Sequence, residues 1–257
     1  MKKFLAILLA SMMLLVCLGS CGNKADEDKE EVTLAGVGSE TVYKGFAYET
    51  NEEGDYTITG YRLETTSEST LSIPTTINDR PVTAIGDGAF KAVLARSIAI
   101  PEGIVTIGKT AFYDCDNLVG LKLPSTVTSI GEAAFADCAK LTNLSLPAEL
   151  TEIPNYMAKD CVSLTSIAVP AKVTSIGAGA FMGCITLKSV SLPTGLTTIG
   201  DSAFVGCAAL KNITLPKSLT TIGQYIFSKE VGTKLTVPAD SKILTYAQEN
   251  EYQYVIK

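Results

Sequence analysis

The 257-residue sequence lacks histidine and tryptophan altogether. Without histidine, it has neither the commonest general base near neutral pH nor the ligand that most often joins cysteine at zinc sites. A Gly-x-Ser-x-Gly nucleophile elbow and a phosphate-binding loop are also missing. We therefore expect no enzyme, no metal centre and no cofactor. A carbohydrate-active enzyme that uses paired carboxylates is the remaining catalytic alternative, because such chemistry needs no histidine.

Basic residues are also fewer than acidic ones: the sequence has 21 Lys and Arg and 27 Asp and Glu, which gives a net charge of −6. Removal of an N-terminal leader that contains Lys2 and Lys3 makes the charge −8. Nucleic-acid partners usually need a basic surface, so this balance argues against them.

The long apolar run in the chain lies at its start. Met1-Lys2-Lys3 precedes the apolar segment from Phe4 to Cys17, which predicts a secretory signal peptide over residues 1–20. The segment ends in Leu18-Gly19-Ser20-Cys21, which resembles the bacterial lipobox and implies that Cys21 is lipidated. Residues 21–40 then read as a lipidated cysteine and an acidic tether on the outer face of a membrane. An ordinary secreted protein with a chance cysteine is the alternative.

A repeat of 22 or 23 residues begins at Ile85 and runs to the C-terminal region. Six of its units start with Ile-Gly and one starts with Ile153-Pro154. Each unit contains a Leu-x-x-Leu-x-Leu core, and neighbouring units of such repeats fold by stacking on one another. The predicted fold is a leucine-rich-repeat solenoid (α/β, β-rich), with one parallel strand per 23-residue coil and short helical turns on the back.

Two columns of the repeat are predicted to fill the core. The turn segment Ile-Gly-x-x-Ala-Phe-x-x-Cys has apolar residues at offsets that suit a short helical turn. Buried cysteine is the preferred interpretation of the thiols, with disulfides and metal binding as alternatives. The two columns are Phe90, Phe112, Phe135, Phe181, Phe204 and Phe227, and Cys115, Cys138, Cys161, Cys184 and Cys207.

The glycine after each Ile predicts either a turn with positive φ or tight packing. Pro154 occupies this column in one coil, and proline is held near φ of about −65°. We therefore favour tight packing.

Three side-chain groups are candidates for contact with a ligand. The outward residues of the strands form a small, shallow and largely neutral face, on which we expect an extended and weakly held ligand, with binding at the loops or the caps as the alternative. These residues are Lys122, Asn143, Ser145, Ser166, Ser189, Ser191, Asn212 and Thr214. Tyr113, Tyr156 and Tyr225 are expected to be exposed on the back of the coils. Asp114, Asp137 and Asp160 should stack on successive coils, as solvated turn caps or, alternatively, as calcium ligands.

Both ends of the stack need caps, because an open strand edge invites aggregation. Residues 41–84 are predicted to form an N-terminal cap with a hairpin around residues 51–55 and a first atypical repeat. Residues 85–238 form the leucine-rich-repeat solenoid, and residues 239–257 a C-terminal cap of a helix and a strand.

The repeat Ala-Phe-x-x-Cys-x-x-Leu and Leu-Pro-x-x-Val-Thr-x-Ile-Gly closely resembles the BspA-like leucine-rich repeats of bacterial surface proteins, over roughly residues 55–257. The resemblance implies a cell-surface recognition or adhesion module for an extracellular protein or glycan ligand, anchored to the membrane by its lipid and expected to be a monomer. It identifies no binding residue, because the family motif is structural. The alternative is an envelope scaffold that presents a partner lipoprotein or enzyme.

Overall fold

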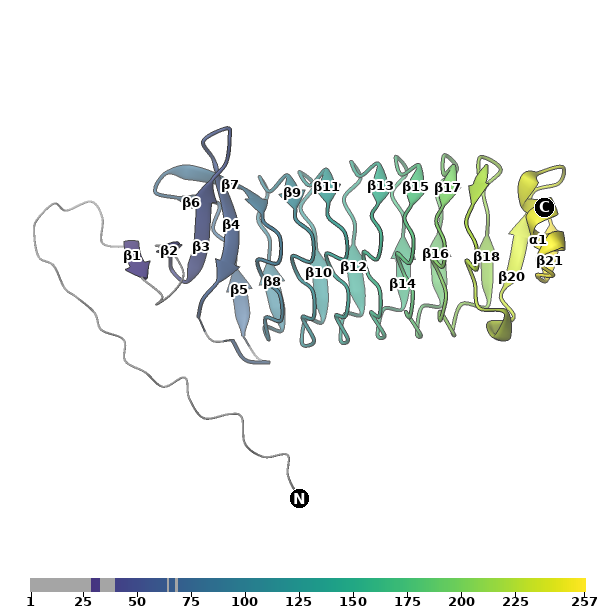
Figure 1. Ribbon diagram of the computed structural model, residues 1–257, viewed down its shortest axis with the longest axis horizontal. Helices are drawn as coiled ribbons and strands as arrows, with labels where there is room; N and C mark the ends of the chain where they lie inside the picture. The colour runs from purple at the N-terminus through teal and green to yellow at the C-terminus, as the bar shows by residue number, and fades with distance from the viewer. Residues whose placement is uncertain (1–28, 33–39, 64, 68) are drawn as a thin grey trace, which may run out of the picture.

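The computed structural model describes residues 29–32, 40–63, 65–67 and 69–257, which form an elongated rod of stacked coils (Figure 1). Successive coils align residues 23 positions apart, as in the pairing of Leu121 with Leu144. The predicted solenoid is therefore confirmed. The signal peptide and Cys21 lie outside the described residues.

One side of the rod, which we call the strand face, is built from the Leu-x-Leu segments. In the three-residue strands the central residue, which is the first Leu, Ile or Val of the segment, is buried or largely buried, and the flanking residues are mostly exposed, as the alternating pattern predicts. Neighbouring strands pair in parallel, in the groups β5 with β8, β10 with β12, β14 with β16, and β18 with β20. These strands are β5 (Thr70–Ser72), β8 (Ser97–Ala99), β10 (Gly120–Lys122), β12 (Asn143–Ser145), β14 (Ser166–Ala168), β16 (Ser189–Ser191), β18 (Asn212–Thr214) and β20 (Lys234–Val237).

A second row of short strands lies between the strand face and the turns on the back of the coils, and each of these strands ends at the Ile that begins a repeat unit. The row is split into two sheets between β11 and β13. Pro154 explains the split, because in other coils the residue after Ile donates its backbone N–H to the preceding coil, as Gly131 does to Ile107 O at 2.8 Å. The strands are β7 (Arg80–Ile85), β9 (Thr106–Ile107), β11 (Ser129–Ile130), β13 (Glu152–Ile153), β15 (Ser175–Ile176), β17 (Thr198–Ile199) and β19 (Thr221–Ile222). Outside this row, β6 (Thr76–Ile77) pairs antiparallel with β7.

The glycines in this row pack tightly, as predicted, and none of the six has a positive φ. A Cβ atom built on Gly131 would lie 2.4 Å from the backbone nitrogen of Lys109 in the preceding coil. Glycine is therefore required by the close approach of two backbones rather than by its own conformational freedom.

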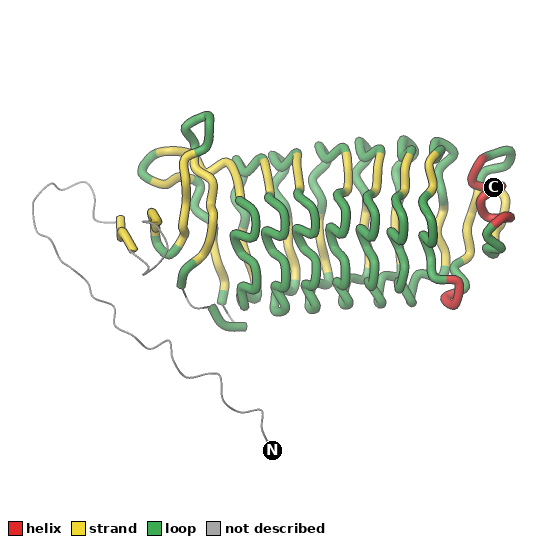
Figure 2. Tube along the Cα trace, viewed as in Figure 1, coloured by secondary structure: helices red, strands yellow, loops and turns green. Residues whose placement is uncertain are grey.

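The back of each coil consists of turns, and here the expectation of short helical turns was wrong (Figure 2). Alternate N–H groups donate to the next coil, as those of Phe112 and Asp114 do to Ala134 O and Ala136 O at 2.8 and 3.0 Å. These groups are then unavailable for hydrogen bonds within a helix. Six coils also have two residues in the left-handed region, four positions apart, and such residues interrupt a right-handed helix.

These left-handed positions form two columns along the rod. The first turn column consists of Gly88, Thr110, Ala133, Tyr156, Gly179, Ser202 and Tyr225. The second turn column consists of Ala92, Asp114, Asp137, Asp160, Gly183 and Gly206.

The core is a continuous stack of apolar residues between the strand face and the turns. Phe112 and Phe135 have ring centroids 5.6 Å apart with an interplanar angle of 13°, and Phe90 stacks on Phe112 at 5.3 Å. The stack is interrupted in the coil that carries Met157 and Ala158, both of which are fully buried. It resumes with Phe181, Phe204 and Phe227.

The N-terminal cap contains the predicted hairpin. Its strands are β3 (Phe46–Thr50) and β4 (Tyr56–Tyr61), and β4 pairs in parallel with β7 of the solenoid. The cap also contains β2 (Glu40–Tyr43), which pairs with β1 (Lys29–Val32). Residues 29–32, which belong to the region expected to act as an acidic tether, thus pair with the edge of this sheet.

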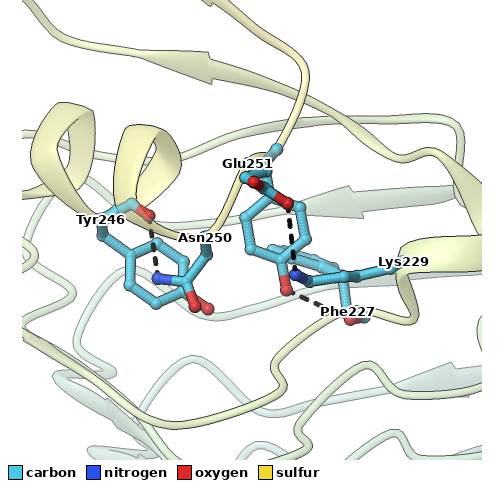
Figure 3. A network of polar contacts seen from close by, with 6 residues as sticks. Phe227, Lys229, Tyr246, Asn250 and Glu251 are labelled. Atoms are coloured by element: carbon cyan, nitrogen blue, oxygen red, sulfur yellow. Dashed lines mark hydrogen bonds and ion pairs between the residues drawn. The ribbon is translucent and has the colours of Figure 1, made fainter.

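The C-terminal cap is a helix followed by a strand, as predicted. It consists of the 3-10 turn η1 (Lys229–Val231), α1 (Lys242–Glu249) and β21 (Tyr254–Ile256), and β21 pairs with β20. Figure 3 shows the polar contacts that hold it, including Asn250 Nδ2 donating to Tyr246 O at 3.0 Å and the Lys229–Glu251 ion pair. Within the described ranges, no helix has the length and apolar character needed to cross a bilayer.

Candidate functional site

The structure brings the predicted ligand-face residues together on the strand face, and all of them are exposed. Lys122 lies beside Ser145 and Ser166 beside Ser189 in the parallel register, so side chains of consecutive coils repeat at roughly the 4.8 Å spacing of strands. Ser145 Oγ lies 3.4 Å from Asn143 Oδ1 and donates to it. The exposed members are Lys122, Asn143, Ser145, Ser166, Ser189, Ser191, Asn212 and Thr214.

This face offers hydrogen-bonding groups without deep relief. Apart from Lys122, its side chains are small hydroxyls and amides, and the backbone beneath them is held by the parallel ladders and the buried core. A rigid, shallow face of this kind suits an extended ligand that contacts many coils weakly.

The five cysteines lie in the core and are free. Each thiol donates to a backbone carbonyl of the preceding coil at 3.1 to 3.2 Å, as Cys161 does to Phe135 O. Burial raises the pKa of Cys184, and it raises that of Cys207 to about 12. Thiolates are the reactive form, so these side chains are chemically inert in the folded protein.

We expect iodoacetamide to leave these five thiols unmodified in the native protein and to modify them all in denaturant, as measured by intact mass. Because the folded-state pKa of Cys184 and of Cys207 is raised, the stability from these two protonated thiols is fully present below the ordinary thiol pKa of about 8.5 and is lost as the pH rises from there. Modification of all five at pH 7.5 without denaturant would contradict the burial.

The aspartates of the second turn column are explained by their backbone conformation. Asp114, Asp137 and Asp160 have φ of 60°, 59° and 56°, and the next two coils have glycine at this position. Asp and Gly are residues that tolerate the left-handed region. In the part of the chain that the structure describes, no group of three or more His, Cys, Asp or Glu is arranged to hold a metal ion.

The three tyrosines that the sequence places on the back differ in their surroundings. Tyr113 is half-buried, with Lys91 Nζ 5.1 Å from its ring centroid, and its hydrogen bond to Asp137 raises its pKa. Its expected exposure was therefore overstated. Tyr156 and Tyr225 are 37% and 73% exposed. Both also have positive φ, of 56° and 53°, which no feature of the repeat signals.

Replacing Tyr225 with glycine is expected to raise the free energy of unfolding by about 0.5 to 1 kcal/mol, because the left-handed region disfavours a Cβ atom by more than glycine's added chain entropy costs. Chemical denaturation provides the measurement. Tyr113→Gly serves as the control and should lower stability, because the φ of Tyr113 is not positive and its ring is packed. A destabilised Tyr225→Gly would show that its ring supports the fold.

Two shallow grooves also mark the surface. One, of about 350 Å³, follows the glycine row across Gly86, Gly108 and Gly131. The other, of about 240 Å³, lies between β19 and α1 and is lined by Lys242, Glu249 and Tyr246. The Tyr246 hydroxyl is buried and has no hydrogen-bond partner among the described residues, and burial raises the pKa of this tyrosine.

Comparison with known proteins supports the fold independently. The family described as the BspA type leucine rich repeat region matches in six copies, over residues 58–188 and 151–253. A leucine rich cell surface protein from Faecalibacterium prausnitzii is 31% identical with a TM-score of 0.72, over 81% of this chain and 56% of that one. The chain thus spans little more than half the length of that relative. No curated protein matches the chain.

Two further solved structures share the architecture. The leucine rich repeat protein TpLRR of T. pallidum is 26% identical with a TM-score of 0.62, over 84% of this chain and 98% of its own length. A leucine-rich repeat protein from Eubacterium ventriosum is 29% identical with a TM-score of 0.57, over 70% of this chain and 48% of that one. Repeat motif, solenoid and these likenesses agree, and the chain belongs to the BspA-type leucine-rich-repeat family.

Proposed function

We propose that this protein is a lipid-anchored, non-catalytic binding module of the bacterial cell surface that recognises an extracellular protein or glycan through its strand face. One observation carries the proposal most directly. Hydrogen-bonding side chains from consecutive coils lie exposed on one rigid face and repeat at strand spacing. Repeat solenoids commonly use such extended surfaces for binding, and the relative from Faecalibacterium prausnitzii is described as a cell surface protein.

The anchoring part of the proposal depends on Cys21. A diacylglycerol on this residue would supply two acyl chains, which suffice for stable membrane attachment. Cells that express the chain and are fed an alkyne-labelled fatty acid should produce a labelled protein. Cys21→Ser should remove the label, whereas Cys17→Ser should retain it. Label that persists in Cys21→Ser would refute anchoring at this position.

The binding part can be tested with the chain carrying Cys21→Ser, on an array of matrix proteins, surface glycans and envelope extract, with and without calcium. We expect a specific ligand whose binding is lost in the double variant Ser189→Arg/Asn212→Arg, because two bulky cations would disrupt the strand face. Ala148→Arg places the same side chain at an exposed position outside the strands and should bind normally.

The array also separates this function from the alternative. A ligand found only in envelope extract from the same cells would favour a scaffold that presents a partner lipoprotein or enzyme. A matrix protein or glycan ligand that is sensitive to the strand-face substitutions supports adhesion or capture.

A further inference from the structure

The most exposed aromatic residues of the solenoid lie in the first turn column, on the side of the coils away from the strand face. Tyr156 and Tyr225 are three repeats apart and therefore about 14 Å apart along the rod, at the spacing of parallel strands. Between them the column contains only Gly179 and Ser202. The Tyr156 ring extends over Gly179, where a Cβ atom would lie 2.6 Å from two of its ring carbons. The two tyrosine rings thus stand on either side of a segment of the column that has only small residues.

Backbone conformation does not explain why tyrosine occupies these positions. The left-handed region favours Gly, Asn and Asp, and five of the six residues of the second turn column are Asp or Gly, whereas the first turn column also contains Thr110 and Ala133. Tyrosine is a poor choice there, and the 73% exposed ring of Tyr225 gains little from packing. The Tyr156 ring does pack on Gly179, so this argument applies to Tyr225: strained residues cluster at functional sites.

A second feature accompanies both rings. Each tyrosine follows an amide residue, Asn155 before Tyr156 and Gln224 before Tyr225, and both amides are exposed. Asn155 Oδ1 accepts the Ala178 N–H at 2.8 Å, and Asp201 Oδ1 accepts the Gln224 N–H at 2.7 Å. A neighbouring coil therefore holds the side chain of Asn155 and the backbone of Gln224. None of the five remaining coils of the repeat has an amide residue followed by an aromatic residue at these two positions.

We propose that the two amide–tyrosine pairs form a binding site for an extended, neutral polysaccharide that lies along the turns parallel to the rod axis. Each exposed ring offers a flat apolar face against which the C–H face of a sugar can stack, while the Asn155 and Gln224 amides hydrogen-bond sugar hydroxyls. Because the Tyr156 ring covers Gly179, the room for a sugar between the two rings lies over the small side chain of Ser202. This inference deepens the proposed function, on which it rests, by naming a ligand class and a second face.

Charge favours a neutral chain over an anionic one. The protein has a net charge of −6, and the exposed Asp201 directly precedes Ser202, the column residue between the two rings. An anionic polysaccharide would be repelled by both, whereas a neutral one would be unaffected.

Affinity electrophoresis of the chain carrying Cys21→Ser, in native gels with soluble cellulose derivative, laminarin, mannan or alginate, tests the proposal. We expect at least one neutral polysaccharide to retard the protein, and alginate to have no effect. Tyr225→Ser and Tyr156→Ser should each weaken binding at least fivefold, and the double variant should abolish it. Serine already occupies this column at Ser202, so these variants should fold. Ile185→Ser removes another exposed apolar side chain and should bind normally.

Absence of retardation by every neutral polysaccharide, or retardation that persists in the double tyrosine variant, would overturn the proposal. The strand-face variant Ser189→Arg/Asn212→Arg separates this failure from failure of the proposed function. If it loses an array ligand while no polysaccharide binds, the surface-binding function stands and the tyrosine site does not. If the wild-type chain binds neither an array ligand nor a polysaccharide, both are wrong.

Discussion

Replacing Phe135 with alanine is expected to lower the free energy of unfolding by about 3 to 5 kcal/mol. The ring is fully buried and stacks on Phe112, and its removal would leave a cavity in the centre of the rod. The neighbouring coil has Ala158 at the equivalent position, so no second ring lies on that side to move into the space. Urea titration followed by circular dichroism gives the measurement.

Tyr225→Ala is the matched control, because it also truncates an aromatic ring, but one that is mostly exposed. Ala133 shows that alanine fits this column. The control should change stability by less than about 1 kcal/mol. A loss below about 1 kcal/mol in Phe135→Ala would mean that the ring column does not form the core.

Gly131→Ala is expected to destabilise the protein by about 2 to 3 kcal/mol, although it adds a single methyl group. The new Cβ atom would lie 2.4 Å from Lys109 N and 2.5 Å from Gly108 C, and these backbone atoms cannot rotate away as a side chain would. The two coils that contain Gly108 and Gly131 would have to move apart. This would weaken hydrogen bonds between them, such as that from Gly131 N–H to Ile107 O. Thermal and urea denaturation of the variant measure the loss.

Gly195→Ala provides the comparison for this substitution. Gly195 has no atom within 4 Å of an added Cβ and its φ is not positive. Alanine there should leave stability unchanged or raise it by up to about 1 kcal/mol, through the lower entropy of the unfolded chain. Equal losses in the two variants would show that close backbone approach is not what the glycine row provides.

Local pattern was enough to predict the solenoid and most of the candidate strand face. The 23-residue period aligns equivalent residues on successive coils, and alternation in Leu-x-Leu places Ser189 and Ser191 outward on either side of a largely buried Val190. Hairpin and helix signals likewise located both caps. The exposure of Tyr225 was predicted because the position follows the repeat register.

The features that the sequence pattern did not predict are set by contacts between segments that are distant in the sequence, mostly between neighbouring coils. The segment around Phe135 has helical periodicity, yet its N–H groups bond to the next coil, so the chain forms turns. Pro154 splits a sheet because the hydrogen bond it lacks is one to another coil, and residues 29–32 pair with an edge that exists only once the cap has folded.

The sequence by itself thus determined the period, the buried columns and the outward residues, because each depends on residues adjacent in the repeat. Only the tertiary structure decided the left-handed turns that hold Tyr156 and Tyr225, the half-burial of Tyr113 beside Lys91, and the packing of Gly131 on Lys109. These features depend on backbone and side-chain contacts between coils, which a single repeat unit does not encode.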